Sequence, residues 1–146
     1  MYTERVTEDH QIGGILYPNS RASGVYATEW FDMSTHHRAV CLVSVGVMSF
    51  ASTVDVLLQE ARDANGTGAQ AIPGKAITQL DQLLGDGDNL CIIELRSIEM
   101  TSRYRYVRAV MTVDDKVAAM CTFVVLIGLV DRDAAVPTPL ITEIVP

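Results

Sequence analysis

The chain has 146 residues, of which 49% are hydrophobic and 20% charged, and its formal net charge at pH 7 is −7. This length suits one domain with its own hydrophobic core, and the apolar fraction excludes disorder over most of the sequence. The acidic charge balance argues against a basic footprint for nucleic acid, so we expect no nucleic-acid partner.

The three cysteines, Cys41, Cys91 and Cys121, each sit in an apolar run and form no CxxC pair. They are therefore expected to be buried free thiols of a protein in a reducing compartment, with no zinc site. The first ten residues lack the apolar core of a signal peptide. The longest apolar stretch, residues 117–130, is shorter than the roughly 20 residues of a membrane helix, so we expect no membrane partner.

The amino-terminal segment, residues 1–27, mixes apolar residues with closely spaced turn signals and predicts an arm or a few short strands. Val- and Leu-rich or alternating segments then predict strands at 39–48, 53–61, 69–77, 90–98, 103–113 and 117–130. Residues 77–84 fit either a strand or a short helix. Asn65–Gly66 and Asp86–Gly87 predict turns between strands.

Six or seven strands in some ninety residues are typical of an all-β sandwich. The predicted fold is a single antiparallel β-sandwich, jelly-roll-like, with extended amino- and carboxy-terminal arms. Its expected parts are an arm at 1–27, the sandwich body at 28–131 and a proline-containing tail at 132–146. Proline disfavours a central strand in that tail, which we expect to be extended.

No constellation predicts a chemistry. Asp86–Asn89 resembles half a calcium loop, but Cys91 and Ser97 occupy the positions that need glycine and glutamate. His36 and His37 are adjacent, would point to opposite faces of an extended chain, and are interpreted as part of a surface turn. A GxSxG elbow and a Walker A loop are both missing from the sequence. We therefore predict no catalytic residue, no metal, no cofactor and no enzymatic activity.

The basic residues are mainly arginine, and one predicted strand alternates them with tyrosine. Both residue types are enriched in interface cores, so this strand is a candidate contact surface; the alternative is a half-exposed strand with solvated charges. Apolar residues of the two terminal segments extend the candidate set. The predicted interface residues are Tyr17, Trp30, Arg103, Tyr104, Arg105, Tyr106, Arg108, Ile141 and Ile144.

Several segments carry a resemblance to a known group of proteins. They are residues 32–34, 38–46, 54–61, 63–69, 74–80 and 104–108, with the clearest match at Asp63–Ala69 followed by Gly74–Leu80. Over roughly residues 28–130 the chain resembles small virion structural proteins of tailed bacteriophages, in particular capsid cement or decoration proteins.

This resemblance implies a sandwich that binds and stabilises the assembled head. It implies two partners, the major capsid protein and the chain itself as a homo-oligomer, with a trimer favoured. It also implies a place on the capsid surface of the virion, after assembly in the host cytoplasm. The alternatives are a head–tail connector or tail component, and a ligand- or glycan-binding β-sandwich for host attachment.

Overall fold

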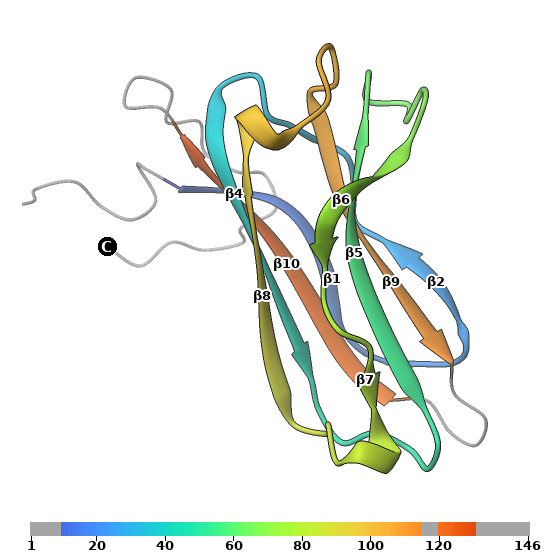
Figure 1. Cartoon of the computed structure of the whole chain (residues 1–146). Helices are drawn as coiled ribbons and strands as arrows, with labels where there is room; N and C mark the ends of the chain where they lie inside the picture. The colour runs from blue at the N-terminus through green and yellow to red at the C-terminus, as the bar shows by residue number, and fades with distance from the viewer. Residues whose placement is uncertain (1–9, 115–119, 131–146) are drawn as a thin grey trace, which may run out of the picture.

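The computed structural model describes residues 10–114 and 120–130, which form two antiparallel sheets packed face to face (Figure 1). Sheet A has the order β1 (His10–Arg21), β10 (Met120–Val130), β4 (His36–Val45) and β8 (Asn89–Arg96). Sheet B has the order β2 (Gly24–Ala27), β9 (Tyr106–Asp114), β5 (Thr53–Ala61) and β6 (Gln70–Ala76). Two short strands extend sheet B, β3 (Phe31–Asp32) beside β9 and β7 (Leu80–Asp81) beside β5.

The connectivity is that of a jelly roll. The strand pairs β1–β10, β2–β9, β4–β8 and β5–β6 are nested within one another, as in a long antiparallel ribbon. The ribbon then folds over, so that β10 also pairs with β4 and β9 also pairs with β5. These two ladders complete the two sheets. This arrangement, two Greek keys in a double sheet, confirms the predicted antiparallel sandwich and defines it as a jelly roll.

Alternation along the strands builds the core. In β5, Val54, Val56 and Leu58 are buried while the residues between them are partly exposed, as period-two patterning requires. The predicted strand 53–61 is confirmed at both of its ends. Sheet A contributes Val43 and Leu95 to the same core, both fully buried or nearly so.

Three glycines on sheet A make room for residues that enter from the segment between β2 and β4. A Cβ on Gly13 or Gly128 would overlap the ring of Phe31, and a Cβ on Gly14 would lie 2.7 Å from the Cβ of Thr28. Thr28 is buried and its Oγ1 accepts a hydrogen bond from the Ala109 N–H of β9. These glycines therefore allow the chain to close one end of the sandwich at van der Waals distance.

The structure differs from the expectation of an amino-terminal arm. Residues 10–27 form β1 and β2, which pair along β10 and β9 and belong to the two sheets. The alternative of a few short strands describes β2, with 4 residues, but not β1, which is a single strand of 12 residues. Residues 1–9 and the predicted tail at 132–146 lie outside the described residues.

The ambiguous segment 77–84 contains both predicted forms. Leu80 and Asp81 make the two-residue strand β7, and Gln82–Leu84 make a single 3₁₀ turn, η1, which the Asp81 side chain caps at the Leu83 N–H. A second 3₁₀ turn, η2, spans Ser97–Glu99. Neither turn, nor any other described helix, is long and apolar enough to cross a membrane.

The connections gather at two opposite ends of the sandwich. One end, here called the hairpin end, holds residues 28–35, 62–69 and 97–105, at the top of Figure 1. The other, the loop tip, holds residues 46–52 and 82–88, at the bottom of Figure 1. The β5 and β9 strands run the full distance between them, so the two ends are separated by roughly 30 Å at about 3.3 Å per residue.

Candidate interaction surfaces

The arginine and tyrosine residues predicted as an interface gather at the hairpin end of sheet B. Arg108 lies opposite Gln59 in the β5–β9 ladder, and its Nε and Nη2 donate to Gln59 Oε1 at 3.0 and 2.9 Å. Its guanidinium lies 4.4 Å from the centroid of the Trp30 ring. The structure thus brings Trp30 and Arg108 together in a cation–π pair, although 77 residues separate them in the sequence.

Two further pairs lie beside this one. Arg62 stacks on Tyr104 at 5.4 Å, and Arg105 stacks on Tyr106 at 5.1 Å. Arg105 also forms an ion pair with Asp32, with Nη2 and Oδ2 3.4 Å apart. These arginines therefore rest on neighbouring aromatic rings of the same chain, in a half-exposed cluster.

The remaining predicted interface residues are dispersed. Tyr17 lies on β1 of sheet A and is 62% exposed. Arg103 occupies the left-handed region, with φ 74°, and its exposed side chain forms no ion pair with the described residues. Ile141 and Ile144 lie outside the described residues. Whether any of these residues meets a partner stays a prediction.

Sequence reasoning missed the outer face of sheet A, which is apolar across several strands. In one row, Ile12 of β1, Ile127 of β10 and Val40 of β4 are register neighbours. In the next row, Leu42 of β4 pairs with Ile92 of β8. All five are partly exposed or exposed, and in β4 and β8 the residues that alternate with them, such as Cys41, Val43 and Ile93, are buried in the core.

This apolar face continues along the edge strand β8. Leu90 is 64% and Ile92 57% exposed, on the side of β8 opposite to the buried Ile93 and Leu95. The face ends in a depression of about 370 Å³ whose rim includes Arg38 and Arg96. A large exposed apolar patch with a charged rim is typical of a protein interaction surface. We call these residues the sheet A face: Ile12, Val40, Leu42, Leu90, Ile92 and Ile127.

A signal for this face was present in the sequence. A strand with one solvated face alternates apolar and polar residues, whereas Val40–Val43 and Leu90–Ile93 are apolar at every position. Such runs predict a strand covered on both sides. In the described fold only one side of β4 and β8 is covered by sheet B.

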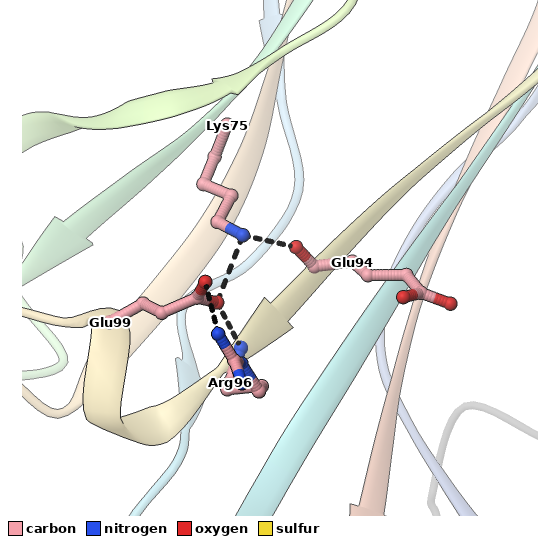
Figure 2. Close-up of polar contacts among 4 residues, drawn as sticks. All are labelled: Lys75, Glu94, Arg96 and Glu99. Carbon is pink, nitrogen blue, oxygen red and sulfur yellow. Dashed lines mark hydrogen bonds and ion pairs between the residues drawn. The ribbon is translucent and has the colours of Figure 1, made fainter.

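The open edge between β6 and β8 is closed by a polar clamp (Figure 2). Lys75 of β6 donates to the backbone oxygen of Glu94 at 2.8 Å and forms an ion pair with Glu99 at 2.9 Å. Glu99 also accepts from the backbone N–H and the guanidinium of Arg96, at 2.8 and 3.2 Å. These contacts tie the edges of the two sheets together and occupy a position at which a foreign strand could pair.

The clamp predicts a shift in one titration. The hydrogen bond from Lys75, aided by those from Arg96, lowers the pKa of Glu99 to about 2. In Lys75→Met we expect this pKa to rise toward the ordinary value of 4.5, whereas Lys75→Arg keeps it low, because a cation still faces the carboxylate. NMR titration of the Glu99 carboxyl group measures both variants. An unchanged pKa in Lys75→Met would contradict the clamp.

His36 and His37 were interpreted as part of a surface turn; the turn is wrong for both, and the surface position is wrong for His36. Both residues lie in β4, His37 exposed and His36 only 5% exposed, with its ring 4.5 Å from that of Phe31. His36 Nδ1 lies 3.1 Å from the Asp32 carbonyl, which can only accept, so Nδ1 carries the hydrogen. Nε2 is buried and has no hydrogen-bond partner among the described residues.

This burial makes stability depend on pH. Desolvation lowers the pKa of His36 below its ordinary value of 6.5, against the opposing influence of Asp32. Below about pH 6.5 the unfolded chain binds a proton that the folded chain resists, so stability falls as the pH drops, by at most about 1.4 kcal/mol per unit. We expect His36→Asn to remove this slope and the exposed control His37→Asn to keep it. Chemical denaturation between pH 5 and 7.5 tests the pair, and equal slopes would rule the explanation out.

The residues considered for metal binding and nucleophilic chemistry are placed as follows. Asp86–Asn89 forms the predicted turn, with Asp88 in the left-handed region. Burial raises the pKa of the Cys41 thiol to about 12, which keeps it protonated at neutral pH, while Cys91 is only partly buried. Within residues 10–114 and 120–130, no group of three His, Cys, Asp or Glu side chains is arranged to hold a metal ion.

The fold and these surfaces define a jelly-roll domain with an apolar outer sheet face. No protein-family model matches the chain, and no curated protein sequence matches it.

Solved structures of low similarity include the following. One is infectious bursal disease virus, Gx strain, at 5% identity and TM-score 0.46, covering 88% of this chain and 34% of that chain. The xylan-binding module CBM15 has 15% identity and TM-score 0.35, and the match covers 77% of this chain and 81% of the module. The C-terminal extracellular domain of Mycobacterium tuberculosis EmbC has 13% identity and TM-score 0.38, and the match covers 78% of this chain and 39% of that chain.

This chain spans about a third of the length of the viral chain. At TM-scores below 0.5, the fold assignment rests on the strand topology of the chain itself.

Proposed function

We propose that this chain is a structural protein of a tailed-bacteriophage head, a cement or decoration protein that binds the assembled shell. The single observation that carries the proposal is the sheet A face. Leu42, Leu90 and Ile92 present apolar surface where a solvated sheet would carry polar residues. Burying such a face against neighbouring subunits is favourable by about 25 cal/mol per Å² of apolar surface removed from water.

The mechanism is stabilisation by preferential binding. A protein that binds the assembled shell and not the free capsid subunit shifts the equilibrium toward assembly, by about 2.7 kcal/mol at a hundredfold excess over Kd. The major capsid protein is the partner in this proposal, and the capsid surface is the site. Arg38, at the rim of the depression, suits a carboxylate of that partner, whereas Arg96 already binds Glu99 and Glu94 lines the same depression.

One feature supports the structural class over the alternative of glycan binding. The jelly-roll topology is used by viral capsid domains and by lectins alike, so it does not separate the two. Glycan binding needs a free aromatic face for stacking, whereas the Trp30 ring already carries the Arg108 guanidinium. A connector or tail protein could bind its neighbours through an apolar face in the same way. The location of the chain on the particle distinguishes these roles from that of a cement protein.

Gradient sedimentation of the native source lysate tests the proposal. Each fraction is probed for this chain, before and after a high-salt wash. We expect the chain to travel with particles of head size and to remain there after the wash, because apolar burial is not screened by salt. A chain that stays at the top of the gradient as a free species would overturn the proposal.

A further inference from the structure

The edge strand β8 carries backbone groups that no described residue pairs. Its only ladder is with β4, and in an antiparallel pair successive residues direct their N–H and C=O groups alternately toward the partner strand and away from it. The Glu94 carbonyl and the Arg96 N–H both make contacts of the clamp, so the even-numbered residues face the open edge. The N–H and C=O groups of Leu90 and Ile92 therefore also point outward, and they have no partner in the described part of the chain.

The side chains along this stretch are apolar as well. Leu90 and Ile92 are each more than half exposed on the outer face of sheet A. An edge that offers unpaired N–H and C=O groups beside exposed apolar side chains is a template for an added strand. The clamp already occupies the edge from Glu94 onward, so the open stretch suits one short extended segment with apolar side chains.

A segment of this chain outside the described residues has the matching composition. Residues 140–145 read Leu-Ile-Thr-Glu-Ile-Val, with four β-branched residues and one charged residue, and they lie between Pro139 and Pro146. β-branched residues favour strands, and proline cannot donate to a ladder, so the two prolines bound a strand of this length. Residues 1–9 match less well, because positions 4, 5, 8 and 9 are charged.

The direction of the strands favours β8 over β1, the other edge of sheet A. β10 ends at Val130, opposite His36, so the chain leaves sheet A at the hairpin end. A segment that returns along the sheet from there runs toward the loop tip. It is then antiparallel to β8, which runs toward the hairpin end, and parallel to β1. Antiparallel pairing is the more stable per residue, and every described ladder of sheet A is antiparallel.

The connection is long enough to reach this edge. Three inter-strand spacings, from β10 past β4 and β8, amount to roughly 14 Å. Residues 131–139, when fully extended, span roughly 30 Å. So short a connection also holds the segment at an effective concentration on the order of millimolar, which favours the chain's own segment over that of another copy.

From the unpaired edge, the composition, the direction and the reach, we infer that residues 140–145 pair antiparallel with β8 of the same chain, as a fifth strand of sheet A. The outward N–H and C=O groups of Leu90 and Ile92 are then bonded in a ladder. Alternate residues of the segment lie beside these two side chains and widen the sheet A face. The outer face stays open for a partner, while the edge is closed to strands of other chains.

Amide hydrogen exchange of the full chain, followed by NMR, tests the inference. The test variant is Thr142→Pro with Glu143→Pro. Adjacent residues of a strand face opposite edges, so one of these two prolines removes an N–H that faces β8. We expect the amides of Leu90 and Ile92 to exchange at least roughly tenfold more slowly in the wild-type chain than in this variant. The Cys91 amide, which faces β4, is the internal reference and should stay slow in both.

The matched control is Ala134→Pro with Ala135→Pro, which places the same two residues in the connection and should keep the slow exchange. Fast exchange of both edge amides in the wild-type chain, or equal protection in the wild-type chain and the test variant, would overturn the inference. Protection that increases with protein concentration would overturn it too, because the added strand would then come from another copy. The test involves no shell, so its failure leaves the proposed function standing.

Discussion

Replacing Gly128 by alanine is expected to destabilise the fold by about 3 kcal/mol or more. The new methyl group would overlap the ring of Phe31 and lie 2.8 Å from Cδ2 of His36. Phe31 is 6% exposed, and its ring packs against both Gly13 of β1 and Gly128 of β10. Overpacking of this kind costs about 1–3 kcal/mol, and expelling a phenylalanine from the core costs about 3–5 kcal/mol.

Thermal and chemical unfolding measure this effect against a matched control. Gly87→Ala adds the same methyl group at a position whose nearest neighbours lie at 3.8 Å, so we expect a change within about 0.5 kcal/mol. If Gly128→Ala does not fold, the double variant with Phe31→Ala still reports on the contact. Removing the ring should make the glycine substitution much less costly, which appears as non-additivity. Equal stability of Gly128→Ala and the wild-type chain would contradict the packing described.

The second large effect concerns binding to the shell. We expect the double substitution Leu90→Glu and Ile92→Glu to lower the affinity for purified shells by about a hundredfold or more. Each side chain is already about 60% exposed on an edge strand, so the fold should persist. In the wild-type chain, binding to the shell would bury the exposed part of these two apolar side chains. Losing that contribution costs about 3 kcal/mol of binding free energy, and about 1.4 kcal/mol corresponds to a factor of ten in affinity.

Val25→Glu is the matched control for this variant. Val25 is 69% exposed on β2, an edge strand of the other sheet, and the substitution adds one glutamate where the double variant adds two. Co-sedimentation with shells that lack the protein compares the three chains. The proposal predicts loss for the double variant and retention for the control. Equal losses would place the contact elsewhere.

The body of the fold was predictable because its strands follow local rules. The β5 strand alternates inward valine and leucine with outward residues that are polar except for Leu57, and its bounds follow from that pattern. The Asn65–Gly66 signal predicted the hairpin turn, where Gly66 has a φ of 81° beside the Trp30 indole. Both signals lie within a few residues of the structure they specify.

The β1 strand was not predictable as one element, because its pairing is long-range and irregular. It pairs with β10, more than a hundred residues later in the chain. Register shifts between Ile12 and Gly14, and between Leu16 and Asn19, accommodate the glycine pair and Pro18 inside the strand. These residues mimic turn signals in the sequence, whereas an edge strand tolerates proline and bulges.

For the interaction surfaces, residue types were predictable and partners were not. The alternation of arginine with tyrosine indicated a special strand, but only the fold shows that Trp30 reaches Arg108 and that Arg62 reaches Tyr104. The sheet A face left a signal in the unbroken apolar runs of β4 and β8. The same runs would occur in strands that other parts of this chain cover on both faces. The sequence alone therefore did not distinguish a core face from a contact surface.

The central claim is that the sheet A face is the surface by which this chain binds a phage head. A cryo-electron microscopy reconstruction of purified particles tests it most directly, because the jelly roll can be fitted and its orientation determined. We predict density for the chain on the outer surface of the shell, with Leu42, Leu90 and Ile92 buried against capsid subunits. Density with this face turned to solvent, or particles without the chain, would contradict the claim.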